Sequence, residues 1–118
     1  MTHLADKICK VASEGEGLKG NDVPHYRAQL HSDWDVREEA LTRKFSFRDF
    51  SEAVEFAQDL TDLVDSQGHH PEVNLSYGEA SLKFSTEEVE GLHENDFIMA
   101  AKIDRLHRKL EAQEKASN

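Results

Sequence analysis

Apolar residues alternate with polar ones in two stretches of the chain, and each stretch contains two short runs. The first, residues 34–47, reads "WDVREEALTRKFSF", with the polar "REEA" between its runs. The second, residues 72–86, reads "EVNLSYGEASLKFST", with Gly78 where a turn would fall. Alternation with a period of two is typical of strands that bury one face, so each stretch predicts a β-hairpin. In the second hairpin, one face of the first strand would carry Val73, Leu75 and Tyr77, and one face of the second strand Ala80, Leu82 and Phe84.

The segment between the two hairpins has the periodicity of an α-helix. Residues 49–68 read "DFSEAVEFAQDLTDLVDSQG", and their apolar positions recur every three or four residues. Asp49 followed by Glu52 resembles a capping box at the start. Gly68 can take the positive φ that often follows a last helical turn. The apolar stripe is wide, which leaves two alternatives: a helix covered by its own sheet, or one whose margin also meets a neighbouring subunit.

Helices are also predicted before the first hairpin and after the second. "DVPHYRAQL" has Pro24 where proline suits a first helical turn. Residues 93–113, "HENDFIMAAKIDRLHRKLEAQ", have a helical apolar stripe at Met99, Ile103, Leu106 and Leu110. The element order is therefore α-β-β-α-β-β-α. We expect an α+β domain with a four-stranded antiparallel sheet and helices packed on one face.

The two ends of the chain have weaker patterns. Residues 1–21 include the glycine-rich "SEGEGLKGND", and we expect them to form a flexible, weakly ordered N-terminal arm. The folded domain should span residues 22–112, with a frayed tail at 113–118. A chain of 118 residues has room for one such domain.

Composition and charge exclude several classes of function. The net charge of -10 at pH 7 argues against nucleic-acid binding, which needs a basic stripe, and against an anionic membrane surface. No stretch has the apolar length of a signal peptide or a membrane span. Cys9 is the only cysteine, so neither an internal disulfide nor a Cys-based zinc site is expected. We expect a cytoplasmic protein with no nucleic-acid or membrane partner.

The tripeptide His69-His70-Pro71 places two imidazoles directly before a proline. Adjacent side chains of a turning or extended backbone point in different directions, and Pro71 biases His70 toward an extended conformation. Imidazole is the side chain best matched to proton transfer near neutral pH. Two alternatives remain from these residues alone: an acid–base pair, or two idle surface histidines. No metal-ligand spacing accompanies them, and no glycine elbow surrounds a serine nucleophile.

A longer constellation surrounds this tripeptide. Asp65 precedes it with three residues between, Tyr77 follows after five more residues, and "GLHENDFIMAAKIDRL" comes after the last strand. Together with "KFSFRDFSEAVEF", this arrangement resembles the pterin-4a-carbinolamine dehydratase family from about Trp34 to Leu106. The resemblance implies the α+β fold and assembly as a homodimer or homotetramer. It also implies a pterin substrate: dehydration of 4a-hydroxytetrahydrobiopterin to quinonoid dihydrobiopterin, with no metal or other cofactor.

The resemblance also implies roles for individual residues. His69 and His70 would be the acid–base pair, and Asp65 would orient one imidazole or hold its charge. Residues that would bind or support the substrate site are Asp65, Pro71, Tyr77 and Asp96. For Asp96 an alternative stays open, because an acidic residue in the first turn also stabilises a helix.

Two positions depart from the family pattern. Where the family usually has a third histidine, this chain has Glu87, which could transfer a proton if burial raised its pKa. Glu87 is therefore the third candidate catalytic residue. His93 stands where the family prefers Ser or Thr, and predicts a slightly weaker helix cap. The alternative function is a catalytically weakened relative that acts as a protein-interaction, assembly or dimerisation factor.

Overall fold

The computed structural model describes residues 4–9, 22–37, 40–85 and 92–116, with side chains described as far as residue 112. Its elements are the short 3-10 helix η1 (Leu4–Asp6), α1 (Val23–Arg27), β1 (Asp35–Val36), β2 (Leu41–Ser46), α2 (Phe50–Gln67), β3 (Glu72–Ser76), β4 (Glu79–Phe84) and α3 (Glu94–Ala116). Apart from η1, this is the order that the hydrophobic pattern predicts. The α+β class is confirmed.

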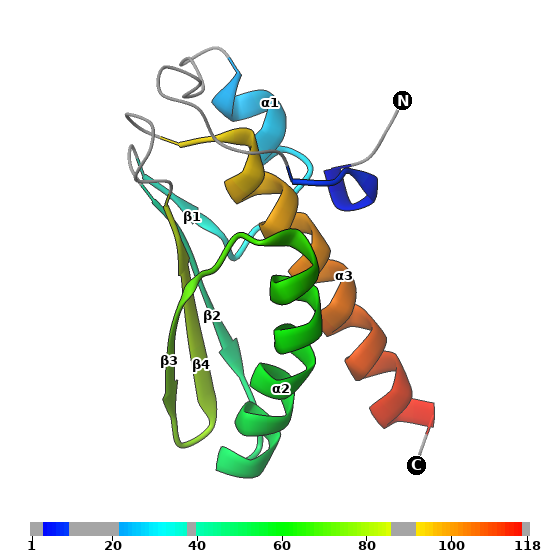
Figure 1. Ribbon diagram of the computed structural model, residues 1–118. Helices are drawn as coiled ribbons and strands as arrows, with labels where there is room; N and C mark the ends of the chain where they lie inside the picture. Colours follow the sequence, from blue (N-terminus) through cyan, green and yellow to red (C-terminus); the bar gives the residue numbers. More distant parts are fainter. Residues whose placement is uncertain (1–3, 10–21, 38–39, 86–91, 117–118) are drawn as a thin grey trace.

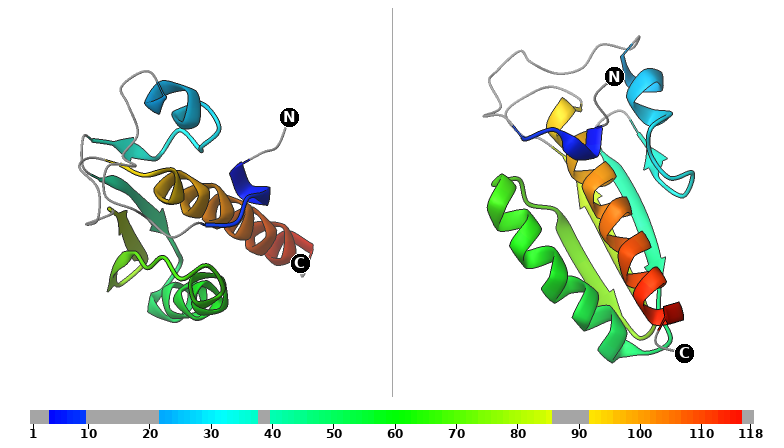
Figure 2. Two further views of the ribbon diagram at one scale, coloured as in Figure 1. Left: turned by 45° about the horizontal axis from the view of Figure 1, so that its top comes forward. Right: turned by 90° about the vertical axis from the view of Figure 1, so that its right-hand side faces the viewer.

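The four strands form one antiparallel sheet in the order β1-β2-β4-β3. The two predicted hairpins are present, and β2 joins them by pairing with β4 from Leu41 opposite Phe84 to Ser46 opposite Glu79. Figures 1 and 2 show α2 and α3 side by side on one side of this sheet, with no described element on the other side. The core lies between these two layers, where Phe45, Phe56 and Phe97 are almost fully buried.

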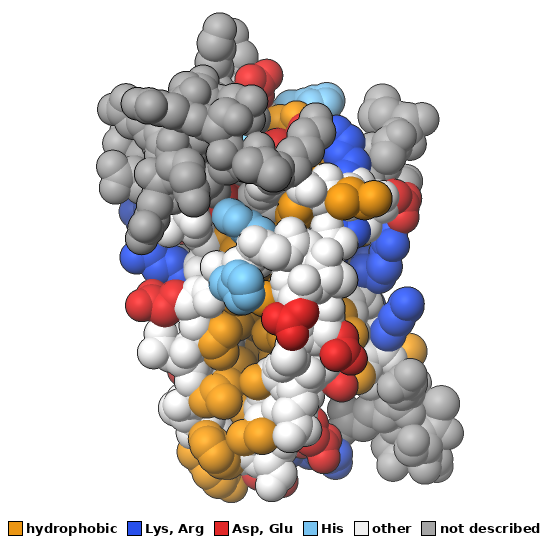
Figure 3. Space-filling model, in the orientation of Figure 1, with side chains coloured by type: hydrophobic (Ala, Val, Ile, Leu, Met, Phe, Trp, Pro, Cys, Tyr) orange, Lys and Arg blue, Asp and Glu red, His pale blue; other side chains and the backbone are white. Residues whose placement is uncertain are grey.

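The strand β3 is less buried than its alternating sequence suggests. Val73 and Leu75 pair with Leu82 and Ala80, which are buried, so all four side chains are on the same face of the sheet. Even so, Val73 is 40% exposed and Leu75 36%, while Tyr77 in the following turn is 80% exposed. Figure 3 shows an apolar strip on this side of the molecule, below histidine side chains. Because β3 is the last strand of the sheet, the helices cover it only in part.

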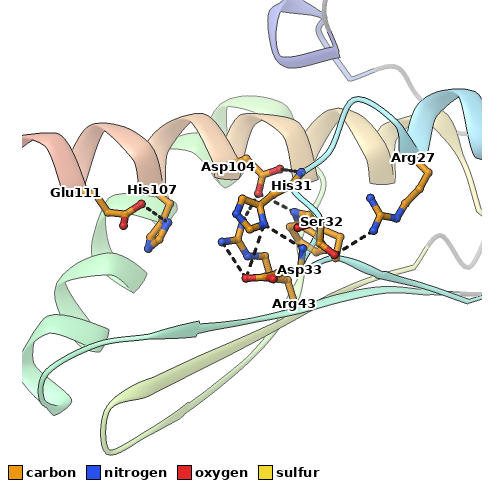
Figure 4. Close-up of polar contacts among 9 residues, drawn as sticks. Arg27, His31, Ser32, Asp33, Arg43, Asp104, His107 and Glu111 are labelled. Atoms are coloured by element: carbon orange, nitrogen blue, oxygen red, sulfur yellow. Dashed lines mark hydrogen bonds and ion pairs between the residues drawn. The ribbon is translucent and has the colours of Figure 1, made fainter.

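A buried ion pair joins α3 to the sheet (Figure 4). Asp104 of α3 accepts hydrogen bonds through Oδ1 from Arg43 Nη1 at 2.6 Å and from Trp34 Nε1 at 2.7 Å. Its Oδ2 accepts the backbone N–H of His31 at 2.9 Å. Arg43 occupies an apolar position in the alternation of β2, so this network explains how a charged residue can lie in the core.

The described part of the N-terminal arm contacts α2 and α3. Leu4 and Ala5 are buried, and Lys102 Nζ of α3 donates to the carbonyl oxygen of Ala5 at 2.8 Å. The backbone N–H of Cys9 donates to Gln67 Oε1 at 2.9 Å. Residues 10–21 lie outside the described residues, so weak order in the arm as a whole stays a prediction. At the other end, α3 continues to Ala116, inside the segment expected to fray.

Candidate active site

Glycine ends α2 and leads the chain into the histidine turn. Gly68 has φ 66° and ψ 21°, in the left-handed region, and its N–H donates to the carbonyl oxygen of Val64 at 2.9 Å. No heavy atom beyond its neighbours in the chain lies within 4 Å of where a Cβ would stand, so only the backbone conformation favours glycine. The helix therefore stops just before His69, and β3 begins just after Pro71. Both imidazoles occupy a short link between two regular elements.

The two adjacent histidines lie in different surroundings. The side chain of His69 is only 14% exposed, and its ring stacks on Phe84 with centroids 5.9 Å apart and planes 10° apart. The side chain of His70 is 66% exposed. Its Nε2 lies 3.9 Å from Oδ1 of Asp65, an exposed residue of the last turn of α2. Ion pairs this exposed hold side chains weakly, so His70 can reorient more freely than His69.

A buried aspartate anchors His69. Asp96 is 0% exposed, and its Oδ1 lies 2.8 Å from Nε2 of His69. Its other oxygen, Oδ2, accepts the backbone N–H of His93 at 3.0 Å. In return, Nδ1 of His93 accepts the backbone N–H of Asn95 at 2.9 Å. Asp96 thus makes its half of a capping box with His93, while the imidazole accepts from the second N–H of α3 and so supplies a cap bond of the kind expected of Ser or Thr.

Asp96 consequently has both of the roles that its position in the sequence left open. One carboxylate oxygen stabilises the first turn of α3, and the other holds the imidazole of His69 in the link between α2 and β3. A carboxylate that faces Nε2 favours the tautomer with the proton on that nitrogen, which leaves a lone pair on Nδ1.

A cavity of about 500 Å³ opens beside the histidine turn. Its walls are formed by the turn itself, with His69, His70 and Pro71, and by the paired ends of β3 and β4. This volume is suited to a small organic molecule.

The predicted site residues are distributed unequally around this cavity. His69, His70 and Pro71 line it, while Asp65 and Asp96 contact the two imidazoles from outside its lining. Tyr77 is not brought there, because it lies in the turn after β3, at the end of that strand remote from Pro71. Five strand residues span roughly 17 Å. Glu87 lies outside the described residues, so its role stays a prediction.

The sequence pattern does not single out Glu72, Lys83 and Ser85, which also line the cavity. A signal for two of them exists in the hairpin. The tight turn at Tyr77 and Gly78 places Ser76 opposite Glu79, and counting back along both strands places Glu72 opposite Lys83. Lys83 therefore lies beside the histidine turn although it is 12 positions after Pro71 in the chain.

Other chemistries have less support in the part of the chain that the structure describes. Burial raises the pKa of the Cys9 thiol to about 11, so little of the nucleophilic thiolate forms near neutral pH. Within the described residues, no three side chains of His, Cys, Asp or Glu are grouped as a metal site would require. The described helices include none with the length and apolar character needed to cross a membrane.

Comparison with known proteins decides the family. The family described as "Pterin 4 alpha carbinolamine dehydratase" matches residues 16–106, which is most of the chain. The chain belongs to this family.

Several relatives of the pterin carbinolamine dehydratase family match along nearly their whole length. Two that are named for the enzyme are 36% identical over 107 residues (Alkaliphilus metalliredigens) and 39% identical over 108 (Rubrobacter xylanophilus). These matches cover 89% and 90% of this chain, and 96% and 100% of the relatives. A solved structure of a transcriptional coactivator/pterin dehydratase from Brucella melitensis has a TM-score of 0.67 and 29% identity, over 76% of this chain and 97% of that one.

A more distant structure shares the pterin dehydratase fold. It is described as a pterin dehydratase-like protein identified as a RuBisCO assembly factor in the alpha-carboxysome. It has a TM-score of 0.54 and 22% identity, and the match covers 64% of this chain and 94% of that chain.

Proposed function

We propose that this protein is a hydro-lyase that dehydrates 4a-hydroxytetrahydrobiopterin, with His69 and His70 as its acid–base pair. The observation that carries the proposal is one cavity lined by two unlike imidazoles, one held by a buried aspartate and the other open to solvent, in a chain of this family. The products are quinonoid dihydrobiopterin and water. Such an enzyme would act in the cytoplasm, in the recycling of the tetrahydrobiopterin that aromatic amino acid hydroxylases use.

Dehydration of this substrate needs a base near N5 and an acid near the 4a-hydroxyl. The base removes the proton from N5, and the electron pair of that N–H bond forms the C4a=N5 double bond. The C4a–O bond breaks as the hydroxyl takes a proton from the acid and leaves as water. This step balances in atoms and charge, and one base and one acid are enough. Imidazole can both accept and donate a proton, so two imidazoles suit the two roles.

The surroundings of the two histidines favour one assignment of these roles. His69 suits the base, because the Asp96 carboxylate at Nε2 leaves Nδ1 as the acceptor and stabilises the imidazolium that forms. His70 suits the acid, because it is exposed and has Asp65 nearby as a counter-charge for its protonated form. Glu87 keeps its place in the proposal as a third proton-transfer group.

The direct test measures how fast the chemically prepared 4a-hydroxypterin decays in the presence of the purified protein. We expect the wild type to accelerate decay over buffer, and His69→Ala and His70→Ala each to lower the rate by about 100-fold or more. His25→Ala, at an exposed histidine of α1, is the matched control and should leave the rate unchanged. If the folded wild type gave the buffer rate, the dehydratase proposal would be rejected.

A further variant tests the departure at position 87. Glu87→His restores the histidine that the family usually has, and we expect it to raise the rate of the same reaction. An unchanged or lower rate would show that Glu87 already fills the catalytic position adequately.

A second function is favoured by two observations. The chain shares its fold with the protein described as a RuBisCO assembly factor, and β3 with its turn leaves Val73, Leu75 and Tyr77 exposed. As an interaction or assembly factor, the protein would bind one defined partner through this apolar face. Tyr77→Ser should then release the partner, and His70→Ala should retain it. Partner loss only with His70→Ala would contradict this second function.

A further inference from the structure

A second cavity lies near the opposite end of α2 from the histidine turn. Its volume is about 510 Å³, and it is formed by the first half of α2, the end of β2 and the last part of α3 with described side chains. It shares no lining residue with the cavity at His69 and His70. The 18 residues of α2 span about 27 Å, so the two cavities are separate sites rather than parts of one.

The floor of this second cavity is aromatic, and His107 lies among its phenylalanine rings. The ring of His107 lies edge-on to Phe47 at 6.2 Å and to Phe56 at 5.9 Å between centroids, and Phe45 lies behind at 4.9 Å. Leu110, one turn further along α3, extends the apolar wall. The acid–base reaction proposed above uses none of these residues.

The contacts of His107 define which of its nitrogens can bind a ligand. Burial lowers the pKa of His107 below its ordinary value of 6.5, so the ring is neutral near pH 7. Figure 4 shows His107 beside Glu111 on α3, and Nδ1 lies 3.3 Å from Oε1 of that residue. A carboxylate at this distance favours the proton on Nδ1. The other nitrogen, Nε2, is then a hydrogen-bond acceptor.

The rim of the cavity is negatively charged. Glu55 and Asp59 occupy successive turns of α2, and Glu111 lies across the opening on α3. Among the described lining residues, the cation is Arg48, which is already paired with Glu52 at 2.6 Å. Carboxylates alone would not define a site, but here they surround an aromatic floor and a neutral imidazole acceptor.

We propose that this second cavity binds a small organic cation, an ammonium or guanidinium group on a flat or aliphatic apolar body. The apolar body packs on Phe47 and Leu110, which are only partly buried, and the ring face of Phe47 also attracts the positive charge. The buried ring of Phe56 supports Phe47 from the core side at 5.2 Å between centroids. An N–H of the cation donates to Nε2 of His107, and the carboxylates of Asp59 and Glu111 balance the charge. This site is independent of the proposed dehydratase reaction.

The test uses 2-phenylethylammonium as the probe, with full-length protein labelled for NMR. Titration should give saturable shifts of the His107 ring and of the amides of residues 52–59. The uncharged analogue 2-phenylethanol should bind at least about tenfold more weakly, equivalent to about 1.4 kcal/mol. Phenylacetate should not bind there. Equal affinity for the amine and the alcohol, or shifts at His69 and His70 in place of His107, would overturn the proposal.

Paired variants separate a specific site from general attraction to an acidic protein. Asp59→Asn, in the rim, should weaken binding of the amine about tenfold, whereas Asp62→Asn, exposed one turn later on α2, should have no effect. His107→Phe keeps an aromatic ring in place but removes the acceptor, and should also weaken binding. Equal losses in both aspartate variants would mean non-specific charge attraction and would contradict the proposal. His70→Ala should bind the amine normally, so a failed dehydratase assay would leave this result intact.

Discussion

A single carboxylate, Asp96, connects helix capping to the proposed chemistry. We predict that Asp96→Asn lowers kcat of dehydration by about 100-fold, because the amide no longer favours the Nε2–H tautomer of His69 or stabilises its imidazolium. Asp65→Asn is the matched control. Its exposed pair with His70 at 3.9 Å contributes about 1 kcal/mol at most, so the loss should stay below about fivefold.

The pH profile distinguishes this positioning role from simple loss of stability. If the Asp96 carboxylate stabilises the imidazolium of His69, the acidic limb of the pH profile of kcat should move in Asp96→Asn. The melting temperature in the same buffers records any damage to the helix cap. A profile of unchanged shape with a lower plateau would assign Asp96 to structure alone.

His107 should make folding stability depend on pH. Its pKa is lowered in the folded protein by burial, so below pH 6.5 the unfolded chain binds more protons than the folded chain. Stability should therefore begin to fall near pH 6.5 and level off below the folded pKa of His107. Urea unfolding at pH 8 and pH 5.5 measures this loss. His107→Phe should reduce the loss and the exposed control His25→Phe should not; an unchanged loss in His107→Phe would contradict the prediction.

The end of α2 depends on one backbone conformation. Gly68 has φ 66°, and a Cβ there would meet open space, so Gly68→Ala should destabilise the fold by about 1–2 kcal/mol through the left-handed conformation alone. Gly68→Asn should cost less, because Asn tolerates this region better. Urea unfolding should show that the wild type is the most stable of the three proteins, Gly68→Asn is less stable, and Gly68→Ala is the least stable. An alanine variant as stable as the wild type would show that the link to His69 can adopt another conformation.

The periodic segments of the chain form the elements expected from them. Asp49 caps α2 by accepting the N–H of Glu52 at 2.9 Å, and Gly68 ends it. Such signals are readable because capping bonds and side-chain periodicity involve residues a few positions apart. Local pattern predicted the face of β3 but not its exposure, because exposure depends on where a strand lies in the sheet.

At the scale of the whole molecule, the outer edge of β3 is the surface best suited to a second subunit. It has no described neighbour, and its apolar side chains are partly exposed. Unpaired strand edges readily add another strand. We predict that the protein forms homo-oligomers through this edge, and that Leu75→Lys lowers the molar mass measured by light scattering. Lys44→Glu, on the opposite face of the sheet, is the control; oligomers that persist unchanged in Leu75→Lys would place the interface elsewhere.

The residues that carry the proposed chemistry were only partly predictable from sequence. The spacing around His69 and His70 pointed to the family, but it did not tell which imidazole is buried or which aspartate holds it. Lys83 was overlooked because its nearness to the turn arises from hairpin register. Tyr77 stands at the family's spacing from the His-His-Pro tripeptide, yet the structure places it beyond the end of β3 that is remote from the cavity.

Periodicity and local spacing were sufficient for the element order, the two hairpins and the histidine turn, since each depends on residues close together in the chain. Tertiary packing decided the contacts between distant residues. His69 and Asp96 are 27 positions apart, and Arg43 and Asp104 are 61 apart. These contacts exist because α3 packs against the sheet and because a buried polar group must find a partner wherever the fold supplies one. No local pattern contains that information.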